Sequence, residues 1–217
     1  LHLCDRRQRQ MCIRDSKYYG IGMIVRQDNN SGLYYEGSVR YGRMDADYAS
    51  GDMIGAGGSK VYADYDSSSY YGAHVGIGKI KKLNETTKAD IYAKLLYTHQ
   101  SGDSVTLGGA GNGEVYDFDA VNSTRARLGA RLSKENGERG TYYAGLAYEY
   151  EFDGEAKATV KGLSTPAPSI KGSSGMLELG YIIQNKDVNA PAVDIGFQGW
   201  SGKKQGFSGN INFIWKF

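Results

Sequence analysis

The last eleven residues, 207–217, alternate apolar and polar side chains with one exception, Ile214. Because successive side chains of a β-strand point to opposite faces, the alternation defines one apolar face. That face carries Phe207, Gly209, Ile211, Phe213, Trp215 and Phe217. An exposed row of this kind is a site of association unless something apolar covers it. The tail therefore predicts the closing strand of an outer-membrane β-barrel, with aromatic residues toward lipid and polar residues toward the lumen.

Composition excludes a helical membrane protein. The chain has 217 residues, of which 40% are hydrophobic, and it contains 31 Gly and 18 Tyr. A spanning helix needs roughly 18 or more consecutive apolar residues, and no stretch of the sequence approaches that length. Barrel strands leave a weaker hydropathy signal, since half of each strand faces a polar lumen. A soluble β-sandwich has a similar composition, so composition alone leaves both folds open.

The first sixteen residues differ from the rest of the sequence. They contain both cysteines, four arginines and two aspartates, and they follow neither a helix nor a strand period. A signal peptide requires an apolar stretch of about 7 or more residues, and this segment has none. We interpret residues 1–16 as a non-native or artefactual leader and residues 17–217 as the C-terminal part of a barrel domain. Without the leader, 22 basic and 22 acidic residues remain, a balance that gives no indication of nucleic-acid binding.

From Lys17 onward the sequence repeats one unit, in which two alternating runs joined by a short turn are followed by a longer polar segment. Strands are predicted near residues 17–27, 32–46, 68–83, 88–101, 119–134, 139–153, 171–184, 190–200 and 206–217. The short turns, rich in Asn, Asp and Gly as tight hairpins require, lie at residues 28–31, 84–87, 134–138 and 185–189. The longer segments, expected as loops, lie near residues 47–67, 102–118 and 154–170.

The order of these connections predicts an orientation. Outer-membrane barrels place short turns on the periplasmic side and long loops outside. This rule puts Phe217 in the periplasm and starts the first readable strand outside, which gives nine strands. Because single-chain bacterial barrels usually have an even number of strands, we expect an incomplete antiparallel transmembrane β-barrel that lacks its first strands.

Two rows of opposite charge are predicted on the lumenal faces of neighbouring strands. The basic row consists of Arg125, Arg127 and Arg131, and the acidic row of Glu149, Glu151 and Asp153. Cross-strand pairs of opposite charge contribute about 0.2–1 kcal/mol each, and the arginine fork matches a carboxylate. The rows either brace the barrel wall or offer a polar surface to a polypeptide in the lumen, and the two roles can coexist.

The sequence predicts no catalytic, cofactor-binding or metal site. His99 is the best candidate for a catalytic base, but it shares the parity of the apolar residues on its strand, which places it at the membrane rim. His74 has the opposite parity, and His2 lies in the leader, so no two histidines have the spacing of metal ligands. Two groups of loop acids could hold calcium, although solvated acids are the favoured interpretation: Asp45, Asp47, Asp64 and Asp66, and Asp103, Glu114, Asp117 and Asp119.

The glycine-rich segment at residues 108–113 also carries no site. It lacks the Gly-Lys-Ser/Thr that a phosphate-binding loop requires, and we expect a mobile extracellular loop there. The sequence contains no nucleotide, haem or flavin motif.

Besides the tail at residues 206–217, four segments of the sequence carry a resemblance to a known family: YGAHVGIG (71–78), ADIYAKLLY (89–97), STRARLGAR (123–131) and YAGLAY (143–148). Together they span most of residues 17–217 and resemble the autotransporter β-domain, the translocator of type V secretion. The resemblance implies a twelve-stranded outer-membrane barrel whose pore holds a helix leading to an N-terminal secreted passenger. The sequence departs from this pattern because the passenger, the helix and about three strands are missing, so a passenger-cleavage asparagine on the helix cannot be transferred.

The resemblance also implies partners. The barrel assembly machinery would recognise a signal in the last strand, formed by Phe207, Ile211, Phe213, Trp215 and Phe217. Outer-membrane lipid and lipopolysaccharide would surround the barrel, and the passenger with its linker helix would occupy the lumen. The expected function is passenger anchoring and export, without enzymatic activity, cofactor or nucleic-acid partner. The alternatives are a porin-like or adhesin barrel, an outer-membrane protease or lipase, and a soluble β-sandwich.

Overall fold

The computed structural model describes residues 13–54, 58–137, 140–184 and 191–214, which form thirteen β-strands. Within these residues, no helix is long and apolar enough to cross a membrane. The strands are β1 (Ile13–Asp28), β2 (Leu33–Ile54), β3 (Lys60–Lys82), β4 (Thr87–Gln100), β5 (Asp103–Gly109), β6 (Val115–Phe118), β7 (Val121–Glu135), β8 (Gly140–Glu151), β9 (Ala158–Val160), β10 (Leu163–Ser164), β11 (Gly172–Ile183), β12 (Ala192–Gly202) and β13 (Gly206–Ile214).

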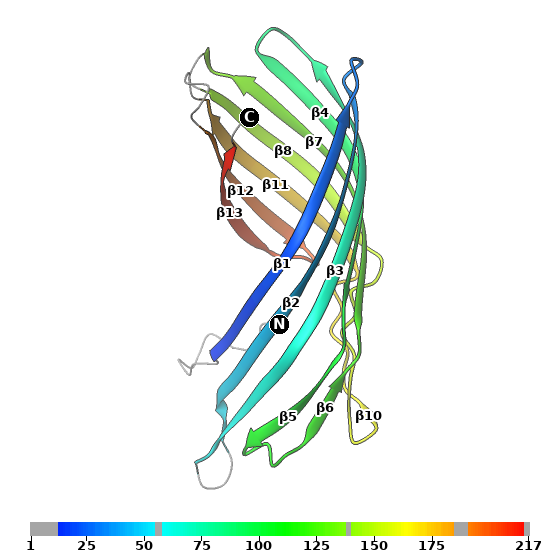
Figure 1. Ribbon diagram of the computed structural model, residues 1–217, viewed down its shortest axis with the longest axis vertical. Coiled ribbons are helices and arrows are strands. Elements are labelled where there is room, and N and C mark those ends of the chain that lie inside the picture. Colours follow the sequence, from blue (N-terminus) through cyan, green and yellow to red (C-terminus); the bar gives the residue numbers. More distant parts are fainter. Residues whose placement is uncertain (1–12, 55–57, 138–139, 185–190, 215–217) are drawn as a thin grey trace.

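Nine strands form the main sheet, an antiparallel meander in the order β1-β2-β3-β4-β7-β8-β11-β12-β13. The strands are long, tilted and curled around a common axis, so that the sheet has the shape of part of a barrel wall (Figure 1). This architecture confirms the predicted fold, an incomplete antiparallel β-barrel.

The turns follow the predicted chemistry where the structure describes them. Gly32 closes the turn between β1 and β2 with a φ of 78°, a conformation that glycine adopts without steric cost. Between β3 and β4, the side chain of Asn84 accepts hydrogen bonds from the backbone N–H groups of Thr86 and Thr87, at 3.1 and 2.8 Å. The turn predicted at residues 185–189 lies outside the described residues. β1 begins at Ile13, so residues 13–16 of the segment interpreted as a leader belong to this strand.

The three segments expected as loops contain strands, so this part of the prediction is wrong. β2 and β3 run beyond the predicted boundaries to Ile54 and from Lys60, while β5, β6, β9 and β10 occupy the other two segments. These four short strands extend the sheet from the Lys60 end of β3 in the order β3-β5-β6-β9-β10 and lie at the lower end of Figure 1. The segment at residues 108–113 ends β5 and makes the turn to β6, with Asn112 and Gly113 at positive φ.

The convex face of the main sheet is apolar. From Thr141 onward in β8 the even-numbered residues are the more exposed ones, while Gly145, Glu149 and Glu151 are buried. The exposed side chains on this face of the sheet include Ile21, Val39, Val75, Ile77, Ile91, Leu95, Leu128, Leu132, Leu146, Leu177, Leu179, Ile195 and Phe197. Tyrosines lie toward both ends of this apolar zone, among them Tyr35, Tyr41, Tyr71, Tyr97, Tyr142 and Tyr148. An apolar band with aromatic residues at its margins is the surface that a transmembrane barrel presents to lipid.

On the concave face, tyrosine rings lie over glycines of the neighbouring strand. A Cβ atom added to Gly78 would overlap Tyr34, one added to Gly129 would overlap Tyr92, and one added to Gly180 would overlap Tyr143. Each glycine lets the ring pack directly against the backbone. These contacts fix the sheet register on the inner face, because a shift of one residue would turn the ring outward.

Replacing Gly180 with valine is therefore expected to lower the free energy of unfolding by about 1–3 kcal/mol, the usual cost of overpacking. Tyr143 cannot swing away freely, because its hydroxyl donates a hydrogen bond to Asp194 at 3.0 Å. Urea unfolding of the refolded chain in detergent measures the change. Gly175→Val is the matched control on the same strand, since its Cβ would meet only the carbonyl oxygen of Ser201, at 3.9 Å. Equal losses in the two variants would contradict the packing account.

Candidate functional site

The polar side chains of the main sheet gather on its concave face. Tyr34 on β2 donates a hydrogen bond to Asp90 on β4 at 3.0 Å, across the intervening β3. Tyr143 on β8 reaches Asp194 on β12 in the same way. Side chains of next-but-one strands converge only on the inside of a curved sheet. The concave face is therefore a polar wall, and it corresponds to the lumenal side of a barrel.

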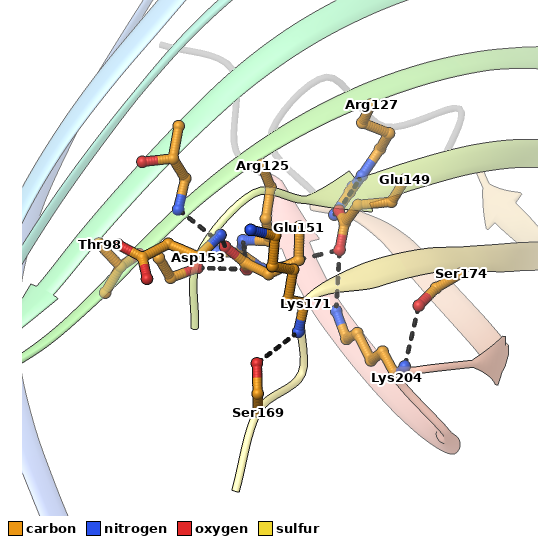
Figure 2. Close-up of polar contacts among 12 residues, drawn as sticks. Thr98, Arg125, Arg127, Glu149, Glu151, Asp153, Ser169, Lys171, Ser174 and Lys204 are labelled. Carbon is orange, nitrogen blue, oxygen red and sulfur yellow. Dashed lines mark hydrogen bonds and ion pairs between the residues drawn. The ribbon is translucent and has the colours of Figure 1, made fainter. Parts of the chain in front are cut away.

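Arg127 and Glu149 form the central ion pair of this wall. They are register partners on β7 and β8. Two guanidinium nitrogens of Arg127 contact Oε2 of Glu149, Nη2 at 2.6 Å and Nε at 2.8 Å. The side chain of Glu149 is only 3% exposed, so its charge depends on this partner for stabilisation. Figure 2 shows the pair beside Arg125, Glu151 and Lys204.

Arg125 and Glu151 are also register partners, but their contact is looser. Arg125 Nε lies 3.7 Å from Glu151 Oε2. The Glu151 carboxylate instead accepts the Ser123 hydroxyl at 2.6 Å and the Thr124 backbone N–H at 2.9 Å. Asp153 lies beyond the end of β8, and its backbone N–H donates to Glu151 at 3.2 Å.

Arg131 pairs with a residue that the two predicted rows did not include. Its register partner on β8 is Gly145, which has no side chain to meet it. The guanidinium reaches across to β11, where Nε and Nη2 donate to the two carboxylate oxygens of Glu178 at 2.6 and 2.8 Å. Glu178 has the lumenal parity on β11, and its place between Leu177 and Leu179 in an alternating sequence is the signal that could have identified it.

Trp200 and Lys204 complete the cluster around Glu149. Arg127 and Lys204 both lie over the Trp200 ring, at 5.0 and 3.5 Å from its centroid. Lys204 belongs to the turn between β12 and β13, and its backbone N–H donates to the Ser174 hydroxyl at 2.9 Å. Its Nζ lies 3.8 Å from Glu149 Oε1. Burial lowers the pKa of Lys204, while the nearby Glu149 carboxylate opposes this shift.

A second polar group lies on β2, β3 and β4. His74 faces the concave side, in agreement with its parity, and its Nδ1 is 2.5 Å from the Ser38 hydroxyl. Its Nε2 lies 3.3 Å from Glu36 Oε1, which also contacts Lys94 Nζ at 2.5 Å. Lys94 thus neutralises the carboxylate next to the imidazole, and the group ties three neighbouring strands together.

A small polar hollow lies nearer the C-terminal strands. Its volume is about 210 Å³. Ion-paired Arg131 and Glu178 form one side, and the hydrogen-bonded Tyr143 and Asp194 form another. The other lining residues are Gly196, Phe197, Gln198, Asn210 and Asn212.

His99 lies on the convex face. It stacks on Tyr71 with ring centroids 4.7 Å apart, and its Nδ1 is 2.8 Å from Asn122 Oδ1. These contacts place it among the tyrosines at one margin of the apolar zone, as its parity predicts. Over the described part of the chain, no group of three or more His, Cys, Asp or Glu residues could hold a metal ion.

The last strand presents the predicted aromatic row to the outside as far as the structure describes it. Phe207, Ile211 and Phe213 are all more than half exposed. Phe207 stacks against Phe197 of the neighbouring strand, with ring centroids 6.2 Å apart. Trp215 and Phe217, the other two residues of the predicted assembly signal, lie outside the described residues.

Comparison with known proteins agrees with this geometry. The family model described as the autotransporter β-domain matches residues 14–188. No curated protein matches the chain. The matched range runs from β1 to beyond the end of β11 and includes the charged wall around Arg127 and Glu149. The chain therefore belongs to the autotransporter β-domain family, and it is an outer-membrane translocator barrel of type V secretion.

Proposed function

We propose that this barrel anchors and exports an N-terminal passenger polypeptide. The observation that carries the proposal is the contrast between the two faces of one sheet. The convex face is an apolar band suited to lipid, while the concave face is lined by ion pairs centred on Arg127 and Glu149. A polypeptide that crosses a membrane needs a wall that hydrogen-bonds to its polar groups, because unpaired polar groups are costly in an apolar environment.

In this mechanism the barrel contributes no bond chemistry. Membrane insertion provides the anchor, and the polar wall provides a path on which the passing segment exchanges hydrogen bonds and ion pairs without entering lipid. The ion pairs also brace the wall, since they join β7 to β8 and to β11. The barrel assembly machinery would recognise the aromatic row of the last strand. Lipid and lipopolysaccharide would cover the convex face, and the C-terminus would lie in the periplasm with the short turns.

Passenger display in a Gram-negative host tests the proposal. The complete reading frame that carries this chain is expressed with an epitope tag in the segment upstream of the barrel. We expect the tag to become accessible to protease added to intact cells. A tag that stays protected, although the barrel is folded in the outer membrane, would contradict export and favour a porin-like barrel.

The enzymatic alternative has a separate test. If the isolated barrel hydrolysed peptides or esters with His99 as the base, His99→Ala would abolish the activity. We expect His99→Ala to change no hydrolytic activity, because the imidazole is held by Tyr71 and Asn122 on the lipid-facing side.

A further inference from the structure

Around Glu149, the cations outnumber the carboxylates on the concave wall. Arg125, Arg127 and Lys204 surround Glu149 and Glu151, and both carboxylates have side chains no more than 5% exposed. These three positive charges face two buried negative charges, so one positive charge remains uncompensated among the five residues; Asp153, the third member of the predicted acidic row, is exposed beyond the end of β8. Charges of one sign on a wall of low dielectric constant attract a ligand of the opposite sign.

The two carboxylates are already satisfied by closer donors. Glu149 Oε2 receives both contacts from Arg127, at 2.6 and 2.8 Å. Glu151 receives the Ser123 hydroxyl and the Thr124 backbone N–H. A carboxylate bonded in this way gains little from further donors.

Arg125 and Lys204, in contrast, donate no hydrogen bond to either carboxylate. Arg125 approaches Glu149 and Glu151 only at 3.9 and 3.7 Å, and Lys204 approaches Glu149 at 3.8 Å, all beyond hydrogen-bond distance. The Nε of Arg125 is buried without a hydrogen-bond partner in the described structure. A buried donor left unpaired costs free energy, so a ligand that accepts from it is favoured.

The part of the concave wall that lies toward the short turns carries more acidic than basic side chains. It carries six acids, Asp28, Glu36, Asp90, Glu135, Glu178 and Asp194, against five bases, Arg26, Lys82, Lys88, Lys94 and Arg131. An acidic ligand is therefore directed to the group around Glu149 and away from the other end of the wall.

We infer that Arg125 and Lys204 form a carboxylate-binding site for acidic side chains of the polypeptide segment that passes along the concave wall. Arginine supplies a planar fork that matches a carboxylate, and lysine adds a point charge beside it. Trp200 lies under Lys204 and Arg127 and reports on the site. The inference rests on the proposed function for the identity of the occupant, a polypeptide.

Peptide binding tests the site on the full chain refolded in detergent. Trp215→Phe leaves Trp200 as the only tryptophan, and its fluorescence is titrated with two synthetic peptides that differ only in Glu against Gln. We expect the Glu peptide to bind at least about tenfold more tightly at low salt, since one charge-assisted hydrogen bond contributes enough for that ratio. We also expect the ratio to fall as salt is added.

Variants separate the site from general charge effects. Arg125→Gln with Lys204→Gln should abolish the preference for Glu, whereas Lys79→Gln, on the exposed convex side of β3, should retain it. If the double variant fails to refold, judged by heat-modifiable gel mobility, Lys204→Gln alone is used, because Lys204 lies in a turn outside the strands. Equal binding of the two peptides, or a preference that survives these substitutions, would overturn the inference.

The two proposals fail in different ways. Passenger display without a preference for the Glu peptide would contradict the carboxylate site and support the export function. A clear preference for the Glu peptide without passenger display would support the carboxylate site and contradict the export function.

Discussion

Replacing Arg127 with glutamate is expected to lower the free energy of unfolding by about 3–5 kcal/mol, the usual cost of breaking a buried ion pair by changing one partner. The new carboxylate would face Glu149, which is 3% exposed and would lose contacts at 2.6 and 2.8 Å. Urea unfolding in detergent measures the stability, and the amount of heat-modifiable barrel in the outer membrane measures assembly. We expect assembly to fall with stability.

Two further variants serve as references for the size of this stability loss. Arg127→Gln removes the charge without adding repulsion, and Arg125 and Lys204 still lie near Glu149, so we expect an intermediate loss. Arg43→Glu reverses an exposed charge on the convex side of β2 and should change stability by no more than about 0.5 kcal/mol. If Arg127→Glu unfolded at the same urea concentration as the unmodified chain, the ion pair would contribute nothing to the stability of the barrel wall.

Replacing Leu146 with arginine is expected to destabilise the barrel by about 2–4 kcal/mol in a lipid bilayer, the cost of a cation at the middle of the lipid-facing surface. Leu146 lies in the middle of β8 and is 67% exposed on the convex face. In water, an exposed leucine could be replaced by arginine at almost no cost. The size of the loss therefore reports which solvent covers this face.

Ser173→Arg is the matched control for Leu146→Arg. Ser173 has the same outward parity, but it lies at the start of β11, near the margin of the apolar zone. A cation there should cost only about 0–1 kcal/mol. Unfolding of both variants is measured in the same lipid vesicles. A cost at Leu146 no larger than the cost at Ser173 would contradict a membrane-embedded convex face.

The nine membrane strands could be predicted because each has one apolar and one polar face, and the alternation survives in the sequence. The extension of β2 to Ile54, the extension of β3 from Lys60 and the four short strands could not be predicted in this way. They lie together at the lower end of Figure 1, and their sequence lacks the long apolar alternation of the membrane strands. Cross-strand hydrogen bonding of the backbone joins them, and a few apolar side chains, Val61, Ala63, Val105 and Ala158, are buried among them.

The charged wall was predictable only in part. Register opposes Arg127 to Glu149 and Arg125 to Glu151, and parity alone was enough to group these residues. The pair of Arg131 with Glu178 needs the curvature of the sheet, because the two residues lie on next-but-one strands with Gly145 between them. The place of Lys204 depends on the turn after β12, which folds its side chain back onto Trp200. Such contacts follow from curvature, which alternation along one strand does not encode.

Site-specific labelling in the outer membrane tests most directly whether the two faces of this sheet meet lipid and an aqueous lumen. Cys4 and Cys12 are replaced by serine, and single cysteines are placed at two pairs of neighbours: Leu146 and Ala147 on β8, and Phe197 and Gln198 on β12. We predict that the cysteines at Leu146 and Phe197 react only with a membrane-soluble reagent, while those at Ala147 and Gln198 react with a water-soluble one. Labelling of all four positions by the water-soluble reagent would contradict a translocator wall embedded in lipid.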